Sequence, residues 1–142
     1  MTELTLDIAR KILDAALAKA GEKKLKPLVI AILDARGALK LTAAQDGTSL
    51  MRAEIAHGKA YGALAMGVGS KTLGARAVER PHFIGAVNGA IDGAMVPVAG
   101  GVLIRIDGEI IGCVGVTGDS SDNDDLAARA GIAAAGLTAD PS

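Results

Sequence analysis

Large aromatic side chains are almost absent from this chain of 142 residues, which has no Trp and holds only Tyr61 and Phe83. Half of the residues are nevertheless hydrophobic, so the core must be built from Ala, Val, Ile and Leu. Nineteen glycines add to these small side chains and predict that the elements pack closely. With so few aromatic rings, we do not expect base stacking as a way of binding nucleic acid.

A strong charge of either sign is also missing, because the formal net charge is -1. A near-neutral chain offers no electrostatic footprint for nucleic acid or for an anionic membrane surface, so we predict neither partner. No apolar run approaches the roughly 18 residues of a membrane span. The N-terminal residues lack the charged, apolar and small-residue sections of a signal peptide, and we therefore expect a cytoplasmic protein.

Cysteine and histidine are scarce. Cys113 stands alone in a predicted buried strand, which excludes a disulfide within the chain and favours a small apolar core residue. The two histidines, His57 and His82, do not form a His-Glu-x-x-His motif. We therefore predict no metal site.

Apolar residues recur at helical spacing near both ends of the chain and form two hairpins between them. The more informative hairpin has apolar, β-branched runs on both sides of Asp107-Gly108, a pair that suits a tight turn with positive φ. The predicted helices cover 4–20, 49–66, 71–79 and a last segment after residue 120; the predicted strands cover 28–33, 38–43, 102–106 and 109–118.

The expected helix ends follow from capping residues and from one proline. Residues 82–95 are predicted to be irregular because Pro81 breaks the third helix, with at most one helical turn near 84–87. The candidate caps are Thr2 or Thr5, Ser49, Ser70 or Thr72, and Ser120 or Ser121; the last helix is expected to turn Leu126, Ala130, Ala133 and Leu137 inward. The fold class predicted is α/β (α+β), one domain over residues 1–142 with a central antiparallel sheet and helices on both faces.

Several short motifs in a fixed order resemble the GlcG/HbpS-like family, which includes the C-terminal domain of PduO-type proteins. They are a strand ending in Asp34-Ala35-Arg36-Gly37, then Asp46-Gly47, Ala56 with Lys59-Ala60, Thr72, Gly100-Gly101, residues 111–118, and Asp124-Asp125 before Ala127. The resemblance covers almost the whole chain. Leu103, where a proline is usual, and Ala44-Gln45, where Arg-Met is common, depart from the family pattern.

The resemblance implies a profilin-like sandwich that associates with itself, from dimers to octamers. It also implies haem as the named cofactor candidate, because some relatives bind haem, and an accessory role beside a catabolic or cofactor pathway. It does not imply one particular reaction.

Lys59 is the first candidate for a functional residue, because its helix otherwise consists almost entirely of small side chains. A cation in such a setting either has a depressed pKa or holds an anion such as a carboxylate or a haem propionate. The alternative is a solvent-exposed lysine, or one that pairs with an acid such as Glu54 or Asp46.

His57 precedes Lys59 by two residues, so the two side chains point about 200° apart around a helix. The simpler interpretation of His57 is a histidine of the core or of an interface. The alternative is an axial ligand of haem iron. His82 and Phe83 are predicted to lie in a loop, where they could contact a flat cofactor or be a surface histidine beside a core phenylalanine.

Two further candidates belong to loops. Gly100-Gly101 leads into a strand, either as a bend or as exposed backbone amides that could dock an anion. Asp119 belongs to an acidic stretch that suits helix capping, yet it could line a pocket. The segment from Gly67 to Thr72 has the wrong spacing for a phosphate loop.

The leading hypothesis is a small-ligand or cofactor-binding protein, with haem as the candidate and Lys59, His57, His82, Phe83, Gly100 and Gly101 as cofactor-binding residues. The alternative is an isomerase-type or lyase-type enzyme for a small carboxylated metabolite. Its catalytic candidates are Lys59, His82 and Asp119. A purely structural subunit is the third hypothesis.

Overall fold

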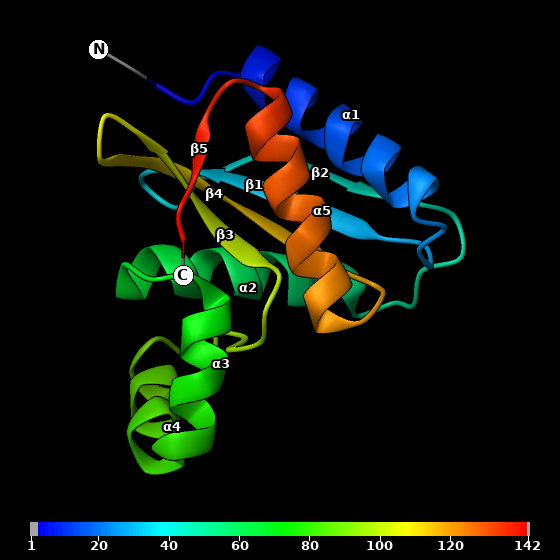
Figure 1. Ribbon diagram of the computed structural model, residues 1–142. Coiled ribbons are helices and arrows are strands. Elements are labelled where there is room, and N and C mark those ends of the chain that lie inside the picture. The colour runs from blue at the N-terminus through cyan, green and yellow to red at the C-terminus, as the bar shows by residue number, and fades with distance from the viewer. Residues whose placement is uncertain (1–2, 142) are drawn as a thin grey trace.

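The computed structural model describes residues 3–141 of the chain, so the candidate cap Thr2 lies outside the described residues. Helices flank a sheet of short strands (Figure 1). The elements in chain order are α1 (Leu6–Glu22), β1 (Val29–Asp34), β2 (Leu39–Ala44), α2 (Arg52–Met66), α3 (Ser70–Glu79), α4 (Pro81–Ala90), β3 (Gly101–Ile106), β4 (Glu109–Thr117), α5 (Ser121–Ala134) and β5 (Thr138–Ala139).

The strands form one sheet in the order β2-β1-β4-β3-β5, and every neighbouring pair is antiparallel. Helices α1 and α5 cover one face of the sheet, and α2 covers the other (Figure 1). This arrangement confirms the predicted fold class. The hairpin between β3 and β4 is confirmed as well, since Asp107 and Gly108 have φ values of 50° and 83°.

The larger part of the core fills the space between the sheet and the α1 and α5 layer. A smaller cluster lies on the α2 side, where Cys113 packs with Leu33, Ala60 and Leu103. Cys113 is fully buried, and burial raises the pKa of its thiol. The prediction of an apolar core cysteine is confirmed, because a buried thiol that stays protonated is inert.

Helix α2 lies unusually close to the sheet because two strand residues that face it have no side chain. A Cβ atom added at Gly115 would clash with the carbonyl oxygen of Ala56, and one at Gly101 would clash with that of Lys59. Both strand positions are buried under α2. The glycines of β3 and β4 therefore set the distance between the helix and the sheet.

Two expectations about helix ends are wrong. Pro81 does not leave an irregular segment behind it, because it occupies the first turn of α4, where a missing N–H costs nothing. Ser49 and Ser70 make no side-chain cap for α2 and α3. The hydroxyl of Ser70 instead accepts a hydrogen bond of 2.6 Å from the amide of Gly101.

The inward face of α5 also differs from the expected one. Leu126 is 38% exposed, whereas Asp124, Ala127, Ala128, Gly131 and Ile132 are buried. The buried residues of α5 include two carboxylates, Asp124 and Asp125, and a glycine, and neither residue type contributes to an apolar stripe. At the N-termini of α1 and α5 the expected caps Thr5 and Ser120 are confirmed.

The close approach of α2 predicts opposite effects for two glycine substitutions. Gly115→Ala should lower the free energy of unfolding by about 1–3 kcal/mol, because overpacking forces the helix away from the sheet. Gly85→Ala, on α4 with open space around it, should raise the free energy of unfolding by about 0.5–1 kcal/mol through helix propensity. Chemical denaturation measures both. Equal changes for the two variants would contradict the packing role of Gly115.

Candidate functional site

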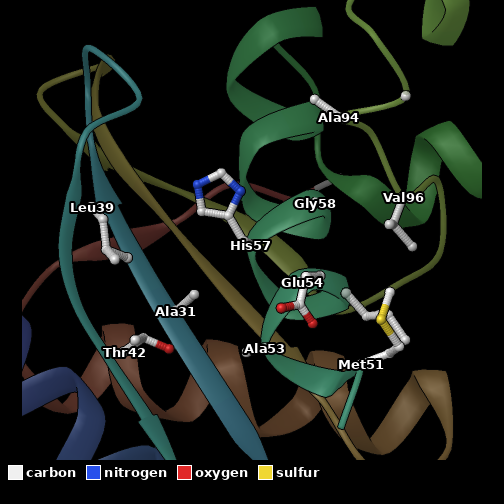
Figure 2. A pocket seen from close by; sticks show the side chains of 12 residues that line it. Ala31, Leu39, Thr42, Met51, Ala53, Glu54, His57, Gly58, Ala94 and Val96 are labelled. Atoms are coloured by element: carbon white, nitrogen blue, oxygen red, sulfur yellow. The ribbon is translucent and has the colours of Figure 1, made fainter.

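An apolar groove opens between the edge strand β2 and helix α2 (Figure 2). Helix α2 packs on β1, β3 and β4 rather than on β2, so this face of β2 stays uncovered. Leu39 is 51% exposed there, and Met51 at the start of α2 is 57% exposed. The groove has a volume of about 540 Å³, and its walls are mostly apolar.

The side chain of His57 brings an imidazole ring into this groove. Its ring extends from α2 toward the strands, and Glu54 lies one turn earlier on the same side (Figure 2). The ring stacks on Tyr61 with a centroid separation of 5.8 Å and an angle of 14° between the planes. Neither ring nitrogen bonds to another residue in the described part of the chain, so both are free for a ligand.

Lys59, on the buried side of the same helix, forms an ion pair with Asp124 of α5. Its ammonium donates to Asp124 Oδ2 over 3.2 Å and to the carbonyl oxygen of Val116 over 2.9 Å. The two side chains are only 3% and 2% exposed. Lys59 thus pairs with an acid, which is one of the alternatives expected from the sequence. The partner, however, is neither Glu54 nor Asp46.

Burial dominates the electrostatics of this pair. Desolvation lowers the pKa of Lys59 and raises the pKa of Asp124, because each charged form loses its hydration. The opposite charge of the partner offsets part of both shifts. A second carboxylate oxygen, Asp124 Oδ1, accepts a hydrogen bond of 3.0 Å from the amide of Asp119.

Gly100 and Gly101 pack directly against Lys59. A Cβ at Gly100 would lie 2.9 Å from the ammonium nitrogen of Lys59. The amide of Gly101 donates to Ser70, and the carbonyl of Gly100 accepts 2.9 Å from the amide of Val116. These contacts give both glycines a role in packing, and their cofactor-binding role stays a prediction.

Asp119 and Lys59 line one small pocket of about 250 Å³, so two of the three catalytic candidates do lie near each other. The carboxylate of Asp119 accepts from Asn123 Nδ2 over 2.7 Å and from the amides of Lys26 and Ser120 over 2.8 and 2.7 Å. The hydrogen bond from Asn123 and those from the two amides lower the pKa of Asp119 to about 2. Asp119 thus joins the start of α5 to the loop before β1.

His82 and Phe83 lie on α4, which projects from the sheet beside α3 (Figure 1). Both are exposed, and the guanidinium of Arg80 lies 4.7 Å from the centre of the Phe83 ring. The structure therefore does not bring these two residues to Lys59 or to His57.

Residues 3–141 contain neither a candidate metal cluster nor a candidate membrane-spanning helix. That range holds no group of three or more His, Cys, Asp or Glu side chains placed to hold a metal ion. None of the helices within it is long and apolar enough to cross a membrane.

The sequence interpretation missed the strand side of the groove, which is formed by Ala31, Leu39 and Thr42. These residues belong to the first hairpin, and they form a wall only because β2 is an edge strand. The one available signal was the weaker hydrophobicity of β2 compared with β1.

Comparisons with known proteins agree with one another. A family model described as haem degrading protein HbpS-like matches residues 4–133. Corrinoid adenosyltransferase PduO from Citrobacter freundii is 31% identical over 120 residues, and that of Salmonella typhimurium is 30% identical over 120 residues. The match covers 84% of this chain but 35% of each relative, so the chain corresponds to about a third of their length.

Two solved structures share the fold and part of the sequence. A PduOC:heme complex has a TM-score of 0.86 and 27% identity, with coverage of 96% of this chain and 98% of that one. HbpS has a TM-score of 0.80 and 28% identity, with coverage of 94% and 90%.

The buried pair predicts a strong effect of removing one partner. Lys59→Met should lower the free energy of unfolding by about 3–5 kcal/mol, because Asp124 is left as an unpaired buried charge. The double variant Lys59→Met with Asp124→Leu should regain most of that loss. Urea unfolding of the unchanged protein, Lys59→Met, Asp124→Leu and the double variant measures the coupling. A double variant as unstable as the sum of the single variants would show that the two residues do not interact.

The hydrogen bonds to Asp119 predict a contribution to stability that depends on pH. The folded pKa of Asp119, about 2, lies below the ordinary value of 3.8, so the contribution is present above pH 3.8 and is lost as the pH falls toward 2. Asp119→Asn should therefore show a smaller loss of stability across that interval than the unchanged protein. Thermal melts at low ionic strength measure it, and parallel pH profiles would contradict the assignment.

Proposed function

This chain belongs to the HbpS-like family of haem-degrading proteins, and from that premise we propose that it binds haem in the groove between α2 and β2. The observation that carries the proposal is His57, whose imidazole enters an apolar groove without a hydrogen-bond partner among the described residues. An imidazole nitrogen is a common axial ligand of haem iron.

The apolar lining and the size of the groove suit a porphyrin. Its walls are apolar apart from Glu54, Thr42 and His57, and its volume of about 540 Å³ lies in the usual range of ligand sites. The stacked ring of Tyr61 holds the plane of His57 in one orientation. Glu54 disfavours propionates at its own position, so we expect the propionates at the solvent side of the groove.

Each residue has a separate task in this proposal. His57 supplies the iron ligand, the small side chain of Ala31 leaves space for a flat ring, and Leu39 and Met51 exclude water from its edge. Bound haem would supply an iron centre for redox or oxygen chemistry. The groove is open to solvent along the edge strand, which suits reversible uptake better than permanent enclosure.

The other predicted cofactor residues lie elsewhere. The ammonium of Lys59 uses two of its three N–H donors in hydrogen bonds to Asp124 and Val116. His82 and Phe83 lie on α4 and would form a different, solvent-exposed site. The enzyme alternative rests on Lys59 and Asp119, which share the pocket of about 250 Å³. His82 does not belong to that pocket, so the proposed acid–base set is incomplete there.

We also propose an accessory role in the cytoplasm for a self-associated form of the chain. Support comes from relatives named corrinoid adenosyltransferase, in which the matching region is one part of a longer protein. A binding domain beside a cofactor-processing domain is consistent with that organisation.

Haemin titration tests the proposed function. The protein should give a saturable shift of the Soret band, and His57→Ala should weaken binding by about tenfold or more, or about 1.4 kcal/mol. His82→Ala is the matched control, because it removes the other histidine from an exposed helix.

Two outcomes would overturn the proposal. One is the absence of a saturable shift in the unchanged protein. The other is a loss of binding in His82→Ala with full binding in His57→Ala, which would move the site to α4.

A further inference from the structure

A second, polar pocket lies where β4 ends and α2 begins. It has a volume of about 290 Å³ and is lined by Lys26, Thr48, Ser49 and Arg52 together with Gly47 and Gly118. None of these residues lines the apolar groove. The two cavities are therefore separate sites that flank the start of α2.

Arg52 is held in place at this pocket. Its Nη1 atom donates a hydrogen bond of 2.9 Å to the hydroxyl of Thr117, which is only 1% exposed. The remaining guanidinium N–H groups have no acceptor within residues 3–141. A fixed guanidinium with free donors is well suited to a planar carboxylate or to phosphate oxygens.

The charge of the lining has one sign. Lys26 and Arg52 are both cationic, and the lining contains no carboxylate. Two acids adjoin lining residues in the chain: Asp46 precedes Gly47, and Asp119 follows Gly118. The oxygens of Asp119 accept from Asn123 Nδ2 and from two amides. The acidic residue in the first turn of α2, Glu54, lies in the apolar groove instead.

Polar groups beside the start of α2 complete the lining of this pocket. Helix α2 has 15 residues and begins without a hydrogen bond from a capping side chain. The N–H of Arg52, the first residue of the helix, donates to the carbonyl oxygen of Ser49 over 3.2 Å, and the next two residues line the apolar groove. The hydroxyls of Thr48 and Ser49 provide polar groups on the same side of the pocket.

From the two cationic side chains, the fixed guanidinium and the two hydroxyls of the lining, we propose that this pocket binds the phosphate or carboxylate group of a small anionic metabolite. The pocket volume suits a compact ligand rather than a porphyrin. Binding here does not depend on haem, because the two cavities share no lining residue.

Isothermal titration calorimetry with inorganic phosphate and, separately, with succinate tests the site. At least one probe should bind saturably at low salt, and binding should weaken about tenfold or more in Arg52→Gln, since each charge-assisted contact to the anion is strong. Lys26→Gln is a second variant, whose side chain has no hydrogen bond within the described residues. Arg10→Gln, on the exposed side of α1, is the control and should bind like the unchanged protein.

The two probes separate the sources of the anion, because preference for one identifies a phosphate or a carboxylate site. Absence of saturable heat with both probes would overturn the proposal, as would equal weakening by Arg10→Gln and Lys26→Gln. Haemin binding measured on Lys26→Gln should be unchanged, so a failure here is distinct from a failure of the haem proposal.

Discussion

The close contact between α2 and the sheet is the constraint on which the rest of the structure depends. Two glycines, Gly101 and Gly115, let the helix backbone approach the strands, and an added Cβ at either would meet a carbonyl oxygen of α2. Lys59 crosses the same interface to pair with Asp124. A buried ion pair is costly to break from one side, so the contact is specific as well as close. The position of α2 then determines both cavities.

The same contact connects the helix to the loop before β1. Asp124 accepts from the amide of Asp119, and Asp119 accepts from the amide of Lys26, so hydrogen bonds run from the buried pair to the loop before β1. Because α2 lies over β1, β3 and β4, the edge strand β2 is left uncovered and the apolar groove opens. At its N-terminal end the helix brings Arg52 beside Lys26. One apolar site and one cationic site thus arise from a single helix placement.

Most of the fold could be predicted from local sequence patterns, whereas the site depended on distant contacts. Asp107-Gly108 has an intrinsic preference for positive φ, and the apolar runs around it could only form buried strands. Pro81 was misleading because a proline ends one helix and begins another equally well, and only the α3–α4 packing decides. The partner of Lys59 lies 65 residues away on α5, beyond the reach of any local pattern. The groove could not be predicted because it exists only through the order of strands in the sheet.

The central claim is that haem occupies the groove beside His57, and paramagnetic broadening by ferric haem tests it most directly. Amide signals of nitrogen-15-labelled protein should weaken first at Ala31, Thr42 and Gly58, the residues that surround the imidazole in Figure 2. Signals of α4 should keep their intensity. Broadening confined to His82 and Phe83, or none on addition of haem, would contradict the account.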